Sequence, residues 1–445
     1  MKKSTFTLNA RPNLILSLNL SLLFLFASCT AGGEQSSSTT TLVFKHGKLT
    51  GDPGVIQGLL REFEQEHPGV VVQEEVLPAS TDQQHQYYAI NLDSRHIPFD
   101  VLAVDVIWVS EFARAGWIRS LNRLLPPAER GDYFESALQA ATFDHEIYAI
   151  PWYIDAGVLY YRRDLLARHG FDPPRTWPDL VHMVRTVLDA ERDPALKGFL
   201  WTGKQYEGLV CVALEFMWSH GGNIMEASGM AGAEIALAFM RNLIREGISP
   251  ELVSTADEEA TRLLFADGRA IFMRNWPYVW SLLQQDDSPL RGQVGVTTLP
   301  AFPGYQPASA LGGWMLAVPA RSAHPRLAEE FIAFLSTPPV QQRLALELGY
   351  HPARRSVYAD AALRRAHPSL DDVFPVLMAA RPRPVTPYYL SLSQILQPEL
   401  SAAIVGRKTA EAALVSIRKQ MANLGVADVI PHQATPSVEP AVALR

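Results

Sequence analysis

Short apolar segments with strand character alternate with segments of helical hydrophobic spacing along most of this chain. The strand-like segments fall at 42–44, 70–76, 99–106, 157–161, 270–273, 294–299 and 311–318. Helical spacing is found over 55–67, 87–92, 178–190, 208–220, 231–246, 257–267, 325–335, 338–348, 391–405 and 409–424. Such alternation favours an α/β fold in which helices cover a sheet. Because 445 residues exceed what one ordinary core accommodates, we expect two domains.

The stretch 149–166 combines a breaker, aromatic rings and a carboxylate. Pro151 cannot donate to a sheet, so a central strand is not expected to continue through it. Asp155 lies in an apolar segment, where an unpartnered carboxylate is costly to bury. It is either satisfied by local backbone in a buried turn, or it faces a cleft and accepts hydrogen bonds from ligand hydroxyl groups. The neighbouring rings of Trp152 and Tyr153 suit sugar recognition, because C–H faces lie against rings while hydroxyls donate to carboxylates.

Asp105 is a second candidate for ligand binding, at the end of the strand predicted over 99–106. Ligands of open α/β sheets collect beyond the carboxyl ends of strands, which is where Asp105 would lie. The alternative is that Asp105 caps a helix over 107–115. The two roles are compatible, and both stay open.

Further aromatic residues stand at junctions rich in breakers. Trp276 follows the strand over 270–273. Gly312 and Gly313 precede Trp314 in the candidate strand over 311–318, where glycine permits a ligand to approach the backbone closely. We expect Trp152, Tyr153, Trp276 and Trp314 to face a cleft. The remaining tryptophans considered are predicted to be core: Trp117, Trp177, Trp201 and Trp218.

Charge and motif content exclude several classes of function. The chain has 39 basic and 46 acidic residues, a net charge of −7, whereas nucleic-acid binding usually leaves a basic footprint. The common phosphate-loop, zinc-protease, Cys-x-x-Cys and Gly-x-Ser-x-Gly motifs are missing from the sequence. We therefore predict a protein without catalytic residues, cofactor or metal, and without a nucleic-acid partner.

The N-terminus has the pattern of an export signal. Basic residues precede an apolar stretch over 14–26, which ends in Ala27-Ser28-Cys29. Small residues before a cysteine resemble the bacterial lipobox, with Phe26 where that motif usually has Leu. The resemblance implies cleavage before Cys29 and lipid attachment to its sulfur, with plain secretion as the alternative. We expect an extracytoplasmic lipoprotein anchored to the cell membrane.

The segments next to the predicted anchor and at the C-terminus are expected to lie outside the fold. Residues 29–41 are small and polar and are predicted to be a flexible tether, and residues 426–445 a disordered tail. If Cys29 is lipidated, Cys211 has no cysteine partner in the chain, and we expect it to be a buried thiol.

Several motifs in order along the chain resemble the solute-binding proteins of carbohydrate ABC importers, especially the trehalose/maltose-binding group. They run from about residue 42 to about residue 424, and together they are highly specific. They are Phe63-Glu64 with Pro68-Gly69-Val70, Val104-Asp105-Val106, Tyr153-Ile154-Asp155-Ala156-Gly157 with Leu159-Tyr160-Tyr161-Arg162, the stretch 203–211, Arg274-Asn275-Trp276-Pro277-Tyr278, Asp286-Asp287-Ser288-Pro289, Leu311-Gly312-Gly313-Trp314, and Pro382-Arg383-Pro384 with Pro387-Tyr388-Tyr389.

This resemblance implies a type II periplasmic-binding-protein-like fold, in which a multi-segment hinge joins two α/β lobes with the ligand cleft between them. The implied lobes are 42–152 with 312–355 and 153–308 with 365–424. An α-linked disaccharide such as trehalose or maltose is the implied ligand, delivered by a monomer to a membrane permease. The residues implied to line the cleft are Asp105, Tyr153, Asp155, Trp276, Gly313, Trp314 and Arg383.

The sequence departs from that group over 45–52, where near relatives carry a more acidic loop, and Asp52 is expected to substitute for the missing acid. The exact sugar stays open among trehalose, maltose, sucrose, glucosylglycerol and a longer sugar. Two other functions also stay open. One is a secreted glycoside hydrolase using Asp105 and Asp155 as its carboxylate pair, and the other is a sugar-binding chemosensory protein.

Overall fold

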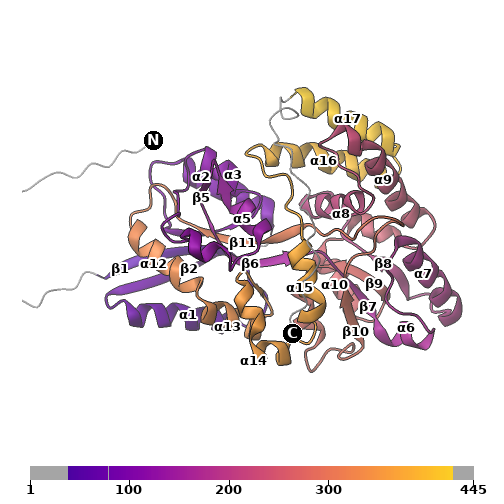
Figure 1. Cartoon of the computed structure of the whole chain (residues 1–445), viewed down its shortest axis with the longest axis horizontal. Coiled ribbons are helices and arrows are strands. Elements are labelled where there is room, and N and C mark those ends of the chain that lie inside the picture. The colour runs from indigo at the N-terminus through magenta and orange to yellow at the C-terminus, as the bar shows by residue number, and fades with distance from the viewer. Residues whose placement is uncertain (1–38, 79, 424–445) are drawn as a thin grey trace, which may run out of the picture. The chain divides into compact units, whose positions relative to one another are not determined.

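Two β-sheets organise the computed structural model, which describes residues 39–78 and 80–423. The six-stranded sheet has the order β12-β6-β11-β3-β1-β2, and the four-stranded sheet has the order β10-β7-β9-β8 (Figure 1). The strands of the first sheet are β1 (Thr40–Gly47), β2 (Val70–Leu77), β3 (Val101–Asp105), β6 (Ile150–Ala156), β11 (Leu311–Ala317) and β12 (His351–Pro352). Those of the second are β7 (Val158–Arg162), β8 (Lys197–Leu200), β9 (Ala270–Asn275) and β10 (Val294–Thr297). A short hairpin, β4 (Thr142–Phe143) with β5 (Glu146–Ile147), accompanies them.

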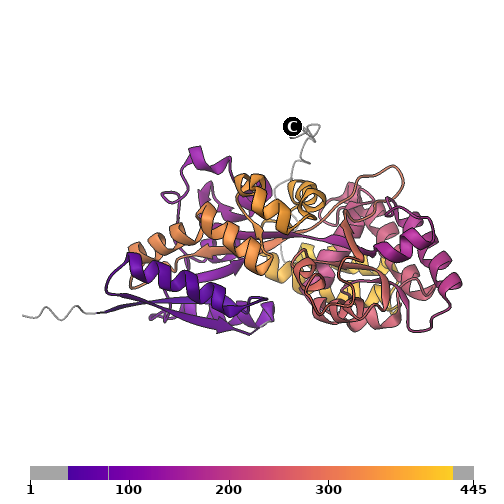
Figure 2. The same ribbon diagram turned by 90° about the horizontal axis from the view of Figure 1, so that it is seen from below.

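Helices flank both sheets, which confirms the predicted α/β class (Figures 1 and 2). Those grouped with the six-stranded sheet are α1 (Pro53–Glu66), α2 (Thr81–Asp93), α3 (Val109–Arg114), α4 (Pro127–Arg130), α5 (Glu135–Ala141), α12 (Pro325–Leu335), α13 (Pro338–Leu348) and α14 (Ala361–Ala366). Those grouped with the four-stranded sheet, directly or through one another, are α6 (Arg163–Arg168), α7 (Trp177–Glu191), α8 (Glu207–Trp218), α9 (Met230–Arg245), α10 (Glu258–Ala266), α16 (Tyr389–Ile404) and α17 (Ala410–Asn423). The short helix α11 (Val279–Leu283) follows β9 and lies against Gly349 at the end of α13. The remaining helix, α15 (Leu370–Ala379), contacts both β6 and β10.

Local sequence signals explain several helix boundaries. The hydroxyl of Thr176 accepts from the backbone of Asp179 at the start of α7, while the Asp179 side chain accepts in return, which forms a capping box. Proline occupies the first turn of α12 and α13, where its missing N–H costs no hydrogen bond. Both helices have the bounds that the hydrophobic spacing predicts, and α8 is buried along almost its whole length, as predicted.

The expectation that Pro151 excludes a central strand is wrong. Pro151 lies inside β6, between β11 and β12 in the sheet. It is tolerated there because β12 pairs only with Tyr153 and Ile154, and because the β6–β11 register shifts between Trp314 and Met315, next to Pro151. The missing N–H therefore falls at an irregularity of the ladder.

The predicted leader (1–28), the lipidation site Cys29 and the predicted tail (426–445) lie outside the described residues. The predicted tether ended at 41, but β1 begins at Thr40 because it pairs with β2 from Thr40↔Val70 onward. Among the helices that the structure describes, none is long and apolar enough to span a bilayer.

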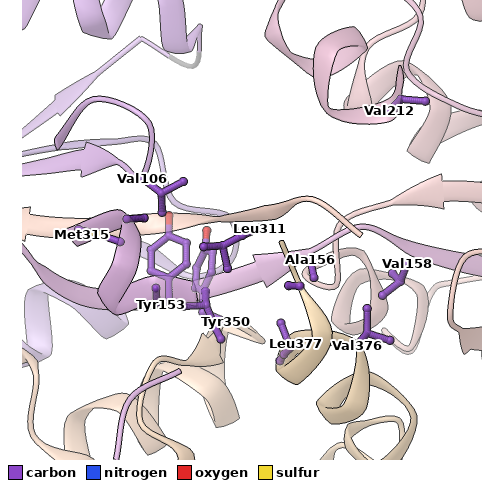
Figure 3. Packing of buried hydrophobic residues seen from close by; sticks show 14 of the residues in the cluster. Val106, Tyr153, Ala156, Val158, Val212, Leu311, Met315, Tyr350, Val376 and Leu377 are labelled. Carbon is purple, nitrogen blue, oxygen red and sulfur yellow. The ribbon is translucent and has the colours of Figure 1, made fainter. Parts of the chain in front are cut away.

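The chain passes from one sheet to the other at Gly157, between β6 and β7. Gly157 N–H donates to Ala310 O (3.4 Å), and Ser309 Oγ donates to Gly157 O (2.7 Å), so the segment before β11 lies beside it. The third segment is joined through Leu311 N–H to Arg381 O (2.8 Å). Figure 3 shows Ala156 and Val158, on either side of Gly157, next to Val376 and Leu377 of α15.

A buried ion pair supports this junction. Arg274 of β9 donates from Nε and Nη2 to the two oxygens of Glu215 of α8 (2.8 and 2.5 Å), and both side chains are 1% exposed. Glu215 Oε1 also accepts from Ala310 N–H (3.1 Å). A Cβ at Gly157 would lie 2.0 Å from Glu215 Oε1, so only glycine fits where the chain passes the ion pair.

Replacing Glu215 by Gln leaves the Arg274 guanidinium buried without its counter-ion. We expect the free energy of unfolding to fall by roughly 3–5 kcal/mol, because an uncompensated buried charge is strongly destabilising. Urea denaturation measures the change. The control is Glu246→Gln, which removes the partner of Arg185 in a pair whose side chains are 39% and 58% exposed, and costs about 1 kcal/mol or less. Equal losses in the two variants would contradict a supporting role for the buried pair.

Candidate functional site

The sheet register brings four of the predicted ligand residues to one edge and one face of the six-stranded sheet. Strands β1, β2 and β3 are parallel, so Asp105 lies at their shared carboxyl edge, as predicted. Antiparallel β11 and β6 place Trp314 opposite Asp105 and Tyr153 opposite Trp314. Gly312 lies opposite Asp155, two residues before Trp314 in β11 and two residues after Tyr153 in β6. Residues directly opposite in a ladder, and residues two apart in a strand, share one face.

Asp155 is a buried carboxylate with an oxygen that no hydrogen bond among the described residues satisfies. Its side chain is on the sheet face just described, the residue is 9% exposed, and no donor among the described residues bonds its Oδ1. Burial raises the pKa of Asp155 to about 8, although the positive charge of Arg274 lowers it. The backbone does not satisfy this oxygen, so the reading of Asp155 as a group satisfied within a buried turn does not hold. An unpaired buried acceptor is what a ligand hydroxyl can satisfy.

Asp105 accepts from the backbone of the turn before α3 but is not the N-cap of that helix, and its role in ligand binding stays a prediction. Its Oδ1 accepts from the backbone N–H of Ile107 (3.2 Å) at the turn before α3, which begins at Val109 and not at 107. The same oxygen accepts from Nη2 of Arg383 (3.2 Å). Burial raises the pKa of Asp105 from its ordinary value, and the nearby Arg383 charge opposes that shift.

Arg383 is the most connected of the predicted residues. It is 4% exposed, and its Nη1 donates to Glu207 Oε1 (2.7 Å) while Nη2 reaches Asp105 Oδ1 and, at 3.5 Å, Leu311 O. Glu207 begins α8, so Arg383 joins a helix of the second group to β3 of the first sheet. The guanidinium is therefore shared by two carboxylates from different parts of the fold.

Tyr153 lies beside Asp155 with its ring against Tyr350, the two ring centroids being 4.4 Å apart (Figure 3). Burial raises the pKa of Tyr153 well above its ordinary value, and the charges of Tyr350, Asp155 and Asp105 contribute. The hydroxyl of Tyr350 accepts from Thr50 N–H (2.7 Å), which ties the loop after β1 to this group.

The prediction that Trp152 faces a cleft is wrong. Trp152 is 1% exposed and packs its ring edge-on to Phe44 at 5.8 Å. It points to the opposite face of β6 from Tyr153, because successive side chains of a strand alternate. Trp177 and Trp201 are buried as expected, whereas Trp117 and Trp218 are only partly buried.

Trp276 is held on two sides. The Arg274 guanidinium carbon lies 4.1 Å from its ring centroid, and its Nε1 donates to Glu258 Oε1 (3.3 Å). A Cβ on Gly312 would lie 2.9 Å from the ring, so the absence of a side chain at 312 makes room for Trp276 beside Asp155. The hydroxyl of Tyr206 donates to the other oxygen of Glu258. Trp276 itself remains partly exposed.

Trp314 is also partly exposed and stands edge-on to Trp108, with ring centroids 5.5 Å apart at 89°. Gly313 precedes it with φ +114°, and a Cβ there would lie 2.4 Å from Tyr153 O. Glycine is thus required at 313 by the backbone and by the close approach of β6, which is independent of any contact with a ligand.

Asp52 lies apart from this set in the described contacts. It is exposed and caps α1, where its Oδ1 accepts from Gly54 N–H (2.8 Å). Its predicted role as a ligand acid stays a prediction.

Sequence reasoning missed Glu207, Glu258 and Tyr350. Glu207 stood in the quoted motif 203–211, but no local pattern indicated that its partner is Arg383, 176 residues away.

The assembled groups are hydrogen-bond acceptors, one arginine and partly exposed rings. Among the described residues, no cluster of three or more His, Cys, Asp or Glu side chains has the arrangement of a metal site. A separate small cavity includes Tyr350, His351 and His367 in its lining but none of the predicted ligand residues. Carboxylates and a guanidinium beside aromatic faces suit a neutral, hydroxyl-rich ligand.

Comparison with known proteins finds relatives that are binding proteins for solutes. A probable ABC transporter-binding protein of Deinococcus radiodurans is 34% identical over 360 residues, which cover 78% of this chain and 85% of that protein. The structure of maltose-bound MalE3 of T. maritima is 36% identical, with a TM-score of 0.81, and the match covers 86% of this chain and all of that one. A maltotriose-binding protein of Pyrococcus abyssi is 25% identical over 58% of this chain and 55% of its own length.

These relatives are solute-binding proteins and not enzymes, so the hydrolase alternative has no support among them. They also bear out the predicted periplasmic-binding-protein-like fold. The family model of the bacterial extracellular solute-binding proteins matches residues 47–342. The chain belongs to the family of bacterial extracellular solute-binding proteins.

Proposed function

We propose that this chain is the substrate-binding component of a sugar ABC importer, and that it binds an α-linked disaccharide of the trehalose or maltose type. The observation that carries the proposal is Asp155, a buried carboxylate whose Oδ1 has no partner among the described residues. Such an oxygen is costly to leave unpaired, so a site that retains it gains from a ligand that donates a hydrogen bond.

The groups around Asp155 support a sugar as that ligand. Asp105 adds a second carboxylate on the same sheet face, and Trp276 and Trp314 add partly exposed rings on which pyranose faces stack. Gly313 is proposed to offer its amide. The maltose in the MalE3 structure, from a relative 36% identical to this chain, supports a glucose-containing disaccharide.

Binding is proposed to close two lobes around the sugar. The proposed lobes are those implied by the resemblance, 42–152 with 312–355 and 153–308 with 365–424. In the structure β6 belongs to the six-stranded sheet through Ala156, beyond the implied bound at 152. The hydrogen-bonded segments at 157, 309–311 and 381–383 are the proposed hinge. A ligand shifts this equilibrium only if it binds the closed form better, and contacts to Asp155 and Arg383 at the hinge supply that difference.

The protein is proposed to act outside the cytoplasm, anchored through a lipid on Cys29 and delivering sugar to a permease. The family's extracellular location supports the first part. A tether between anchor and fold raises the concentration of the binder near its transporter.

A sugar panel tests the proposal directly. We expect trehalose or maltose to raise the melting temperature, since a ligand that binds only the folded state stabilises it. Thermal shift and calorimetry are run with trehalose, maltose, maltotriose, sucrose, glucosylglycerol and mannitol. The control Glu246→Gln, at an exposed pair remote from the site, leaves the response unchanged. Absence of binding to every sugar rejects the proposal, and a preference for mannitol rejects the disaccharide.

The raised pKa of Asp155 predicts pH-dependent affinity. Hydroxyl donors favour the ionised carboxylate, so a bound sugar lowers the Asp155 pKa from about 8. Affinity is then greatest above pH 8 and falls as the pH drops below it, by up to about tenfold per pH unit. Titration calorimetry between pH 6 and about 9 measures this.

The matched variant is Asp155→Asn, which keeps the shape of the side chain and removes its titration. We expect weaker binding by about tenfold or more near pH 8 and a flat dependence over the same range. A wild-type affinity that does not change with pH, or the same pH slope in the variant, would show that Asp155 does not accept from the sugar as an ionised group.

Lipidation is tested by changing each cysteine in turn. Cys29→Ser is expected to release the protein from the membrane fraction of cells that express the full chain, because a single serine carries no thioether lipid. The control is Cys211→Ser at a buried thiol, which leaves the protein with the membranes. Fractionation and mass spectrometry of the mature N-terminus read the outcome, and a Cys29→Ser protein that stays membrane-bound contradicts the anchor.

A further inference from the structure

Glu207 is a buried carboxylate that accepts an unusual number of side-chain hydrogen bonds. It is 7% exposed and accepts from Arg383 Nη1 (2.7 Å) and Tyr389 O–H (2.6 Å) at Oε1, and from Ser393 Oγ (2.5 Å) at Oε2. Its donors come from the segment after α15 and from α16, while Glu207 itself begins α8. Because Glu207 is buried and both of its oxygens already accept from protein donors, we expect its effect on binding to pass through these partners.

The partner that reaches the proposed sugar site is Arg383. With Nη1 fixed on Glu207, Arg383 directs Nη2 to Asp105 Oδ1, which also accepts from Ile107 N–H. No hydrogen bond from the described residues reaches the other oxygen of Asp105. The arrangement therefore occupies one Asp105 oxygen with protein donors and leaves its Oδ2 for a ligand hydroxyl.

We propose that Glu207 is a positioning residue for sugar binding, which holds Arg383 against Asp105 and so fixes the Asp105 oxygen that faces the sugar. The proposal rests on the proposed function, since it assigns to Glu207 a role in that same site. Glu207 does not touch the sugar. The negative charge of Glu207 offsets part of the effect that the positive charge of Arg383 has on the pKa of Asp105.

The charged and titratable groups around the pair define what a pH experiment reports. Arg383 faces both carboxylates, Tyr153 faces Asp105, and Tyr389, Cys211 and Asp82 face Glu207. Burial raises the pKa of Asp105 most, the Arg383 charge lowers it, and the Glu207 charge raises it. Removing the Glu207 charge therefore lowers the Asp105 pKa.

The sign for binding follows from this shift. The sugar contact of ionised Asp105 is present above the Asp105 pKa and is lost as the pH falls through it. In a Glu207→Gln variant that loss occurs at a lower pH than in the wild type. The ratio of variant to wild-type affinity is the useful quantity, because the titration of Asp155 is common to both proteins and cancels.

The experiment measures sugar affinity of the full-length protein and of Glu207→Gln at about pH 7 and at about pH 4.5, near the ordinary range of carboxyl titration. The sugar used is the one of trehalose and maltose that binds the wild type more tightly. We expect Glu207→Gln to bind about tenfold more weakly near pH 7, and the deficit to shrink several-fold at the lower pH. A deficit that is the same at both pH values, or no deficit, overturns the proposal.

The matched control is Glu399→Gln on α16. Glu399 is also 7% exposed and accepts from Lys408 Nζ (2.6 Å), Ser416 Oγ (2.8 Å) and Gln420 Nε2 (3.2 Å), yet none of these partners contacts Asp105 or Arg383 in the structure. It reports what losing a buried carboxylate does to stability alone. We expect its affinity ratio to stay near one at both pH values.

Two further variants keep the test decisive. Should Glu207→Gln not fold, Glu207→Asp retains the charge but draws it away from Arg383, and we expect it to lose several-fold more affinity than Glu399→Asp; equal losses overturn the proposal. In a double-mutant cycle, Glu207→Gln is expected to add little in an Asp105→Asn background, whereas additive losses contradict action through Asp105. If the wild type binds no sugar, the proposed function is rejected. The experiment therefore distinguishes failure of the proposed function from failure of the positioning role of Glu207.

Discussion

The buried ion pair between Glu215 and Arg274 is the interaction on which the rest of the structure depends. Glu215 accepts from the backbone of Ala310, next to the place where Gly157 carries the chain from one sheet to the other. Arg274 stacks under Trp276 and lowers the pKa of Asp155 against the larger effect of burial. A desolvated pair is a costly way to obtain stability. Here the pair lies against the backbone at Gly157 and Ala310 and against the ring of Trp276, and its arginine acts on the pKa of Asp155.

The carboxylates of the site differ in what they are free to do. Both oxygens of Glu207 and both oxygens of Glu215 accept from protein donors, whereas Asp155 Oδ1 has no donor among the described residues. Asp105 is intermediate, with one oxygen occupied by protein donors. The acidic groups thus differ in the number of protein donors that their oxygens accept from. Glu207 and Glu215 hold other side chains, whereas Asp155 and Asp105 each keep an oxygen that a ligand hydroxyl can reach.

Two of the proposed ligand residues lie next to the proposed hinge segments at 157, 309–311 and 381–383, so sugar contacts there affect the equilibrium between open and closed forms. Asp155 is two residues before Gly157 in the chain, and Arg383 is two residues after Arg381, which bonds to the backbone of Ser309. In the proposed closure, ligand contacts at these positions act on the backbone of the proposed hinge. If the ligand groups lay far from these hinge segments, coupling between binding and closure would have to pass through more intervening residues.

The sequence by itself determined the α/β class, most strand and helix positions and the acidic and aromatic candidates, because these follow from hydrophobic period, caps and breakers. It also pointed to Asp105 and Asp155, since a carboxylate in an apolar strand has few explanations. Tertiary structure alone decided that Pro151 lies in a central strand, that Trp152 packs against Phe44 while Tyr153 packs against Tyr350, and that Glu207 binds Arg383. Each of these depends on strand register or on partners more than 150 residues apart, and neither is encoded in local spacing.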